Sequence, residues 1–591
     1  MKEYLEIQYK KLLGLCNLDS GVIGRQSNIN QIIKESVQGF IETCSVPAVW
    51  CYGKHTKMMM TDFMYEMKRI HYIVDTNFAG QEKSGFCIIR EGQIQDYKID
   101  GIIISSYKYK DEIKKNLKEH YPEVRYLDIY EELEKRGVVL SYEYFSQQHP
   151  YGHYSNINTW KRKFLEAKDI AENEYLYRNL VTEYILIKDF RSALCCMEQA
   201  RKELGENAFQ ELLALTKHIY ATELEAASKL SENNVVMLCM DGLREKDFSG
   251  SLLPQMKSWV DQTCYIYKNA YSVSTSTMES LIPAYSENDD LRTHYYETMK
   301  IAEEDCRFVC EAIRQKRNIY FYTDATYYID SVHIKVTDKM QTATEKMWNF
   351  ILDALDENNG LFYIHELYES HFSYPNPYTE ELLVADGTNI MFDYLAVNGQ
   401  RLRTDYDKQH KDALKYLDDV LTPLLERLKC RMVIYADHGN ILLSLAENIW
   451  QVERTKFSFH RDLVHVPLII KSPETGIGYT EKLESIMSLN AILISLMCHR
   501  PVDLSKKEYV KLVRSEIYNP DFRYLYHKCG FDQELLALEV FIFTDGMKLA
   551  IYSNGKSELF LAENDQEVMD DEKKKALIRR VKSRITVCDF L

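Results

Sequence analysis

The fold is decided by residues 235–244, whose sequence is Val-Val-Met-Leu-Cys-Met-Asp-Gly-Leu-Arg. The six apolar residues at its start predict a β-strand that is buried on both faces. The strand ends at Asp241, and Gly242 then allows the backbone to turn. Because ligands of open α/β sheets bind at the carboxyl ends of parallel strands, we expect Asp241 to lie in a functional site.

Further apolar segments predict that this strand belongs to a larger sheet. The additional strands are expected at residues 319–323, 361–364, 431–436 and 466–470, with helical segments between them. Such alternation is typical of the α/β class, in which helices cover both faces of a mostly parallel sheet. We therefore predict one α/β domain from residue 233 to residue 591.

Three later segments carry the polar residues that metal-dependent catalysis requires. They are Ser-Thr-Ser-Thr-Met-Glu-Ser at 274–280, Tyr-Ala-Asp-His-Gly at 435–439, and Phe-His at 459–460 ahead of His-Val-Pro at 465–467. The adjacent pair Asp437 and His438, at a strand end before a glycine, offers an oxygen and a nitrogen ligand to one metal ion. An aspartate that only bonds the backbone at a strand end is the structural alternative.

Together with Asp241, these segments resemble the alkaline phosphatase superfamily, in particular its sulfatase-like branch with the phosphoethanolamine and phosphoglycerol transferases. The resemblance covers residues 233–591 and keeps the motifs in the family's order. It implies an alkaline phosphatase-like α/β fold with a small C-terminal α+β subdomain at residues 505–591.

The resemblance assigns the nucleophile to Thr277. This residue falls on the cysteine of the sulfatase motif and also on the threonine nucleophile of phosphoethanolamine transferases. The segment 274–280 contains no cysteine for conversion to formylglycine, and Leu281 stands where the sulfatase motif ends in an arginine. Sulfatase activity of the formylglycine type is therefore disfavoured. The structural alternative is a helix N-cap, with Ser274 or Thr275 as the capping residue.

The resemblance also implies a metal site formed by Asp241, Thr277, Asp437 and His438. An imidazole ligand favours Zn²⁺ or Mn²⁺ over Ca²⁺ or Mg²⁺. Two further histidines, His371 and His460, fall where the family places residues that contact the transferred group. Each is predicted to protonate the leaving oxygen or to bind a second ion, although a satisfied structural histidine is the alternative for both.

The segment that precedes this domain predicts a second, smaller α/β unit. Residues 1–45 have helical spacing and form a helical lead-in. Residues 46–150 alternate strands and helices as a Rossmann-like domain does, with Gly53 at the phosphate turn and Asp75 directed toward a ribose. Because only one glycine of the usual fingerprint is present, a docking domain without ligand is the alternative.

Residues 151–232 are predicted to be a helical spacer. They contain few glycines and many Leu, Ala, Glu and Lys residues, and part of the segment resembles one helical hairpin of the tetratricopeptide kind. No second copy follows at the period of that repeat, and an isolated repeat does not bury its own apolar face. We therefore expect the hairpin to pack against the domain that follows.

Composition limits the kinds of partner. The chain has 591 residues and a formal net charge of -16, which argues against binding to a nucleic-acid backbone. The 14 cysteines include no Cys-x-x-Cys pair, and neither a signal peptide nor a transmembrane segment is evident. These features predict a cytoplasmic protein with free thiols.

The sequence thus leads to one main hypothesis and its rivals. The main hypothesis is a metal-dependent phosphotransferase or phosphodiesterase that modifies a cell-surface glycan, with phosphoethanolamine or phosphoglycerol as the transferred group. A nucleotide-activated donor is favoured over a phospholipid, and the oligomeric state is left open. The alternatives are a sulfate-ester or phosphomonoester hydrolase, and a non-catalytic assembly component of a glycan pathway.

Overall fold

The structure is a computed structural model of residues 1–591, and it describes most of the chain. Excluded from the description are 17–24, 54, 57–58, 60–65, 77–78, 81, 84–85, 108, 137–150, 165–169, 291, 294, 296–297, 324–327, 338–340, 367–368, 372–373, 380–399, 441–458, 518–522, 524–526, 528–531 and 589–591. The chain divides into a small unit, Lys10–Thr159, and a large unit that joins Met1–Tyr9 to Trp160–Leu591. Each unit is described by itself.

The small unit contains a six-stranded sheet with the order β3-β4-β2-β1-β5-β6. The strands are β1 (Pro47–Trp50), β2 (Tyr72–Val74), β3 (Glu82–Lys83), β4 (Phe86–Ile89), β5 (Gly101–Ile104) and β6 (Arg125–Asp128). All neighbours are parallel except β3 and β4. Without the short β3, the order along the sheet is third, second, first, fourth and fifth, which is the order of a Rossmann-like fold.

Alternating side chains of the central strands form the two cores of the small unit. Val49 and Ile103 face the core that α2 (Arg25–Glu42) and α5 (Ile129–Lys135) cover. Ile102 and Ile104 point to the opposite face, where Ile113 and Leu117 of α4 (Lys110–His120) pack. A strand presents successive residues to opposite faces, so a short apolar strand here needs cover on both sides. The short 3₁₀ helices are η1 (Glu66–Arg69) and η2 (Glu91–Gln93).

The large unit is built around an eight-stranded sheet with the order β12-β10-β13-β7-β14-β15-β8-β16. The strands are β7 (Val235–Met240), β8 (Tyr265–Tyr271), β10 (Asn318–Tyr322), β12 (Ile334–Thr337), β13 (Gly360–Glu366), β14 (Arg431–Tyr435), β15 (Leu468–Lys471) and β16 (Gly478–Ser485). Only β15 runs antiparallel to its neighbours β14 and β8. All six residues of β7 are buried, as the apolar run at residues 235–240 predicts.

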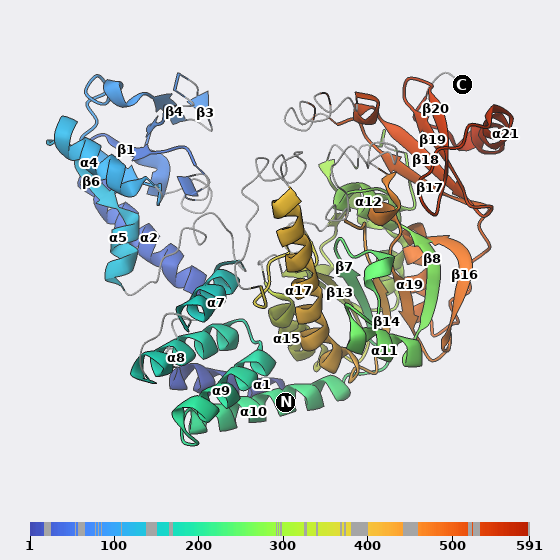
Figure 1. The fold of residues 1–591 in the computed structure, drawn as a ribbon, viewed down its shortest axis with the longest axis horizontal. Coiled ribbons are helices and arrows are strands. Elements are labelled where there is room, and N and C mark those ends of the chain that lie inside the picture. The colour runs from blue at the N-terminus through green and yellow to red at the C-terminus, as the bar shows by residue number, and fades with distance from the viewer. Residues whose placement is uncertain are drawn as a thin grey trace. The chain divides into compact units, whose positions relative to one another are not determined.

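Helices cover both faces of this sheet (Figure 1). One face is covered by α12 (Thr277–Ser286), α14 (Arg307–Arg314) and α19 (Leu489–Met497), and the other by α15 (Ala343–Ala354) and α17 (Gln400–Leu425), with α11 (Pro254–Thr263) against α17. The predicted α/β class with a mostly parallel sheet between helices is confirmed. Short elements of this unit are β9 (Ile301–Ala302), β11 (Ile329–Asp330), η3 (Glu245–Asp247), η4 (Glu303–Asp305), α18 (Arg461–Val464) and η8 (Ile486–Ser488).

A second sheet closes the C-terminal part of the large unit (Figure 1). Four antiparallel strands follow one another in the order β17 (Tyr509–Arg514), β18 (Leu538–Phe543), β19 (Met547–Tyr552) and β20 (Ser557–Leu561). One face packs on α21 (Asp571–Val581), and the opposite face packs on Tyr271, Phe459 and Val464 of the main domain. The remaining 3₁₀ helices are η9 (Asp532–Leu535) and η10 (Lys582–Arg584). The arrangement agrees with the α+β subdomain that the resemblance implies.

The helical segment before β7 contains a hairpin. Its helices are α7 (Tyr151–Phe164), α8 (Ile170–Leu186), α9 (Phe190–Leu204) and α10 (Gln210–Ser228), while α1 (Lys2–Leu15) opens the chain. Helices α8 and α9 are joined by a tight turn, and the Asp189 side chain caps α9 by accepting a hydrogen bond from the Ser192 amide at 2.9 Å. The helix that follows the hairpin, α10, packs against α15 and α17. Within the described residues, no helix combines the length and the apolar character that a membrane span requires.

Candidate functional site

The candidate site lies where three neighbouring parallel strands end. Strand β7 is flanked by β13 and β14, and the registers pair Cys239 with both His365 and Tyr435. Asp241 therefore follows the central strand, His365 lies near the end of one neighbour, and Asp437 follows the other neighbour. Parallel strands end at the same edge of a sheet, which explains why residues far apart in the sequence converge.

Thr277 reaches this edge from the first turn of α12. Its hydroxyl oxygen lies 3.3 Å from Asp241 Oδ2 and 3.3 Å from His438 Nε2. The N-cap residue of α12 is Ser276, and its side chain makes no capping hydrogen bond, so neither Ser274 nor Thr275 caps this helix. The buried Ser274 hydroxyl instead donates to Glu279 Oε2 at 2.9 Å. The first turn of a helix exposes unpaired amide groups, which favour a bound anion.

Two clusters of potential metal ligands share Asp241. One contains Asp241, His371 and His438, and the other contains Asp241, His365 and Asp437, with the ligand atoms of each cluster within 4.8 Å of one another. Asp241 Oδ1 lies 3.5 Å from His438 Nε2 and 4.0 Å from His371 Nε2, while Asp241 Oδ2 lies 3.3 Å from His365 Nε2. The structure thus brings together every predicted metal ligand, His371 and one further histidine.

The donor atoms of this site fit a divalent cation. Asp241 and Asp437 are fully buried, and Asp241 Oδ1 and Asp437 Oδ2 accept no hydrogen bond from the described residues. A buried carboxylate oxygen without a partner costs free energy, which a cation would recover. The Nδ1 atom of His438 lies 2.9 Å from the Gly439 carbonyl oxygen, so the Nδ1 tautomer leaves the Nε2 lone pair for a metal.

Burial and charge oppose each other in this site. Burial alone would raise the pKa of Asp241, but His371, His365 and His438 outweigh it and hold this pKa well below its usual value. Burial alone would lower the pKa of His438, but the charges of Asp437 and Asp241 raise it above its usual value. The site therefore favours an anionic carboxylate facing a positive group, the electrostatic setting of a cation site.

Two glycines allow the backbone segments of the site to approach closely. Gly242 has a φ of 75°, and a Cβ atom there would overlap the Asn440 side chain. A Cβ atom at Gly439 would overlap the carbonyl oxygen of Asp462 and would lie 3.1 Å from Arg244 Cγ. Arg244 is in turn held by Asp247, with Nε 2.6 Å from Oδ2. The segment that carries Asp437 and His438 is therefore fixed against the segment that contains Asp462.

His365 belongs to this site, although the sequence analysis assigned it no role. Its side chain is fully buried at the end of β13, and its Nε2 atom points toward Asp241. The signal that could have found it is its place directly after the predicted strand 361–364, where chemistry is expected. His371 lies at the open side of the site, with 40% of its side chain exposed.

The structure places the other predicted histidine elsewhere. His460 is the N-cap of α18, where its Nδ1 accepts a hydrogen bond from the Asp462 amide at 3.1 Å, and its Nε2 lies 3.9 Å from Asp565 Oδ2. Burial, together with nearby cations, lowers the pKa of His460 to about 4, so the imidazole is neutral at pH 7. His460 is a member of neither ligand cluster among the described residues, and its role stays a prediction.

Gly53 and Asp75 belong to the small unit. Gly53 follows β1, Asp75 follows β2, and Asp75 Oδ2 accepts a hydrogen bond from the Tyr52 amide at 2.8 Å. The carboxylate therefore braces the turn that leads into Gly53. Cys51, the first residue after β1, has a φ of 83°, and strained backbone of this kind clusters at ligand-binding turns.

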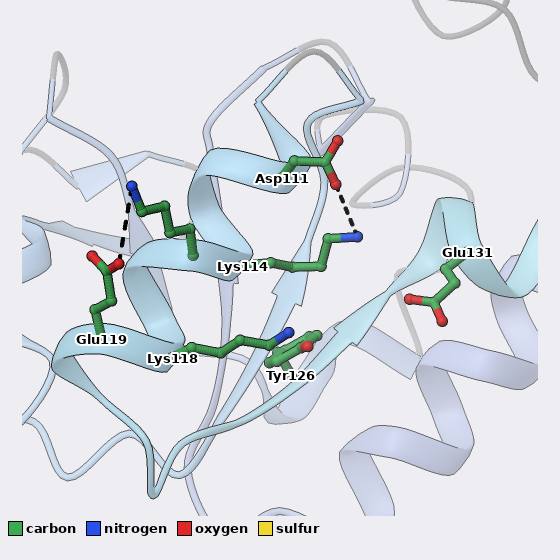
Figure 2. A pocket seen from close by; sticks show the side chains of 7 residues that line it. Asp111, Lys114, Lys118, Glu119, Tyr126 and Glu131 are labelled. Atoms are coloured by element: carbon green, nitrogen blue, oxygen red, sulfur yellow. Dashed lines mark ion pairs between the residues drawn. The ribbon is translucent and has the colours of Figure 1, made fainter.

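A separate pocket of about 570 Å³ lies beside α4 in the small unit (Figure 2). Four of its charged residues pair with one another: Lys114 lies 3.1 Å from Asp111, and Lys115 lies 3.9 Å from Glu119. Neither Gly53 nor Asp75 lines it. Paired charges at the surface are the usual solvated face of a helix, so this pocket adds no candidate chemistry.

Comparison with known proteins gives three findings. The family model "C2185-like, N-terminal" matches residues 47–125, the part of the small unit that begins at β1. No curated protein matches the sequence. Solved structures with similar coordinates come from hydrolases and from a periplasmic domain.

The chain is similar to a phosphonate monoester hydrolase from Silicibacter pomeroyi, with 12% identity, a TM-score of 0.42, and coverage of 60% of this chain and 94% of that chain. A candidate sulfatase from Bacteroides thetaiotaomicron has 11% identity and a TM-score of 0.41, with coverage of 60% of this chain and 91% of that chain. The C-terminal periplasmic domain of EptC from Escherichia coli has 11% identity and a TM-score of 0.34, with coverage of 49% of this chain and 92% of that chain. All three TM-scores are below 0.5, and the identities do not exceed 12%.

Proposed function

We propose that the large unit is a metal-dependent enzyme that transfers or hydrolyses phosphate or sulfate esters, with Thr277 as the nucleophile. The observation that carries the proposal is the position of the Thr277 hydroxyl, 3.3 Å from both Asp241 Oδ2 and His438 Nε2. A hydroxyl at a helix N-terminus, beside two buried carboxylates that each keep one oxygen without a hydrogen bond from the described residues, suits attack on an anionic ester.

Asp241, Asp437 and His438 would hold the cation, and His365 and His371 offer further ligands. A bound Zn²⁺ or Mn²⁺ would favour ionisation of the hydroxyl and would stabilise negative charge that develops on the ester oxygens. The mixture of imidazole and carboxylate donors supports these two metals over Ca²⁺ or Mg²⁺.

The residues of the chain would act in two steps. In the first step, Thr277 Oγ1 releases its proton to solvent and forms a bond to phosphorus or sulfur, while the bond to the leaving oxygen breaks and that oxygen takes up a proton. In the second step, water or an acceptor hydroxyl attacks the threonine ester and releases the hydroxyl again. His371, at the open side of the site, is placed to exchange a proton with the leaving or attacking oxygen.

The finer proposal is that the transferred group is phosphoethanolamine or phosphoglycerol and that the acceptor is a cell-surface glycan. It rests on the match of Thr277 to the nucleophile of phosphoethanolamine transferases. A cytoplasmic location is part of the proposal and is supported by the thirteen described cysteines, all of which are free. Hydrolysis of a sulfate ester or a phosphomonoester is the rival activity, and a non-catalytic assembly role is the rival without an activity.

The test is a screen of phosphodiesters, phosphomonoesters and sulfate esters with protein loaded with Zn²⁺ or Mn²⁺. On a substrate that is turned over, we expect Thr277→Ala to lower the rate by several orders of magnitude, because the covalent route is removed. Thr277→Ser should retain part of the rate. The matched control is Ser276→Ala, since that exposed neighbour caps nothing.

Intact-mass measurement during turnover should show an adduct on the peptide that contains Thr277. A Thr277→Ala enzyme with near wild-type turnover would refute the assignment of the nucleophile. Protein that binds neither metal and turns over no ester would favour the assembly role.

A specific observation also supports a nucleotide-activated donor that binds to the small unit. Successive strands are added on one side of β1 and then, from β5 onward, on its other side, and ligands of such sheets bind in the crevice at that switch point. A Cβ atom at Gly53 would meet nothing within 4 Å, so Gly53→Ala should leave the fold and binding unchanged while Gly53→Trp should block the turn. Thermal-shift titration with nucleoside diphosphates is the measurement, and the absence of any shift would favour a docking domain.

A further inference from the structure

A second cavity of about 450 Å³ lies in the large unit, apart from the residues of the metal site. It opens between the helical hairpin and the main domain. Its lining residues come from α7, α8, α9, α17 and the segment before residue 380. The volume falls within the range of pockets that hold small organic molecules.

The hairpin contributes one face of each of its helices to this cavity. Tyr177, Leu180 and Tyr184 recur at intervals of three and four residues along α8, and Ser192, Cys195 and Gln199 do so along α9. Side chains at such intervals share one face of a helix. The cavity is therefore a product of the hairpin geometry, and the main domain closes its third side with Tyr378 and Asp419.

Aromatic rings form much of the wall. The ring of Phe164 lies 4.5 Å from that of Tyr177, and Tyr177 and Tyr184 are both buried. The hydroxyl of Tyr378 donates to Asp419 Oδ2 at 2.9 Å, which fixes its ring at the rim. Rigid, oriented rings of this kind favour a flat apolar ligand.

The two cationic side chains of the wall, Arg191 and Lys161, have different partners. Arg191 is already paired with Asp419, at 3.1 Å between Nη2 and Oδ1. Lys161 donates to the Pro377 carbonyl oxygen at 2.5 Å and lies 6.0 Å and 5.9 Å from the centres of the Tyr184 and Tyr378 rings. Within the described part of the chain, no carboxylate lies within the 4.0 Å of an ion pair with Lys161.

Lys161 is thus a half-buried ammonium group whose contacts are a carbonyl oxygen and two rings, and the carboxylates of Asp189 and Asp412 attract it only from beyond ion-pair distance. Burial lowers the pKa of Lys161, which reflects the cost of keeping its charge in this environment. An anionic group bound beside it would offset that cost, and the surrounding rings would hold the apolar body of the same ligand.

We propose that this cavity binds a planar organic anion, whose rings lie among Phe164, Tyr177, Tyr184 and Tyr378 and whose acidic group contacts Lys161. The proposal does not depend on the esterase or transferase activity of the metal site. It gives the helical hairpin a ligand-binding role in addition to its packing role.

The probe for the test is 8-anilinonaphthalene-1-sulfonate, an aromatic sulfonate that fluoresces in apolar surroundings, applied to the full-length protein. Its neutral counterpart without the sulfonate is N-phenyl-1-naphthylamine. We expect the sulfonate to bind more tightly, and Lys161→Met to weaken its binding about tenfold or more, as loss of a charged hydrogen bond does. Binding of the neutral dye should be unchanged, because methionine keeps the apolar stem. The matched control is Lys202→Met, an exposed lysine of α9 outside the cavity.

A second variant and a second readout protect the test against a folding defect in Lys161→Met. Cys195→Trp, which fills the mouth of the cavity and keeps Lys161, should abolish binding of both dyes. Saturating sulfonate should also slow alkylation of Cys195 by iodoacetamide, whereas the exposed Cys310 should react at an unchanged rate. The proposal is overturned by equal affinity for the two dyes, by unchanged binding in Lys161→Met or Cys195→Trp, or by equal protection of Cys195 and Cys310.

Discussion

The buried carboxylates of the metal site predict that one substitution has opposite effects with and without metal. Asp437 is fully buried, and its Oδ1 accepts the His438 amide at 2.9 Å, whereas its Oδ2 accepts nothing from the described residues. Asp437→Asn keeps the shape and the accepted hydrogen bond, but it removes the charge and one metal-ligand oxygen. We expect the variant to be more stable than the wild type in metal-free buffer and less stable with metal.

The magnitudes follow from burial and unit size. A buried polar group without a partner costs about 1–3 kcal/mol and a charged one costs more, so replacement of the carboxylate by a neutral amide should recover the difference, about 1–3 kcal/mol. Unfolding a unit of roughly 440 residues changes the entropy by about 0.9 kcal/mol/K. Metal-free Asp437→Asn should therefore melt about 1–3 °C higher than the wild type. A metal at 100 times its Kd adds about 2.7 kcal/mol, or roughly 3 °C, to the wild type alone.

The assay is differential scanning calorimetry of chelator-treated protein, repeated after addition of Zn²⁺ or Mn²⁺. The metal-free comparison is made near pH 9, where imidazoles are neutral, because His438 Nε2 lies 3.7 Å from Asp437 Oδ2 and would otherwise attract it. The metal comparison is made at pH 7.5. Asp261→Asn, a substitution on the surface of α11, is the matched control and should leave both comparisons unchanged.

Two results would contradict this prediction. A metal-free Asp437→Asn protein that melts below the wild type would show that the carboxylate is satisfied without a cation. A metal-induced rise of equal size in both proteins would place the ion elsewhere.

Two further substitutions test the supporting structure. Gly439→Ala should lower the free energy of unfolding by about 1–3 kcal/mol and weaken metal binding, because its Cβ would overlap the Asp462 carbonyl oxygen. The control is Gly250→Ala, which has open space around it, and equal urea midpoints for the two variants would contradict the close approach at Gly439. Burial, followed by the charge of Asp189, raises the pKa of Glu223 from 4.5 to about 8, so the wild type should lose stability as pH rises from about 4.5 to about 8. Glu223→Gln should remove this loss of stability, whereas Glu225→Gln, on the exposed face of the same helix, should retain it. Parallel stability–pH curves for Glu223→Gln and the wild type would contradict the prediction.

The sequence predicts the central strands well because burial on both faces leaves a strong pattern. Strand β7 has the bounds that its apolar run predicts, and the strands expected at 319–323, 361–364 and 431–436 overlap β10, β13 and β14. The sequence did not predict β8 and β16, in which polar residues interrupt the apolar pattern. It also did not show that β15 is antiparallel, because strand direction depends on how the chain crosses the sheet.

The sequence indicates which candidate ligands lie close together only as far as strand-end positions and motif spacing reach. Asp241, Asp437 and His438 lie close together because β7 and β14 end at one edge of the sheet, and Thr277 reaches this edge from α12. The sequence could not decide between His371 and His460, since histidines in loops are placed by tertiary contacts. His371 joins the site, whereas His460 caps α18.

A substitution of His365 can test whether a residue at a strand end belongs to the metal site even though no motif assigns it there. Its Nε2 lies 3.3 Å from Asp241 Oδ2, and it forms a ligand cluster with Asp241 and Asp437. If it binds the ion, His365→Gln should weaken metal binding at least tenfold, because an imidazole ligand is lost, and His333→Gln, on an exposed histidine outside the site, should not. Isothermal titration with Zn²⁺ measures both. If His365 only packs, the two variants will bind Zn²⁺ equally well, and the site will consist of the four residues that the motifs predicted together with His371.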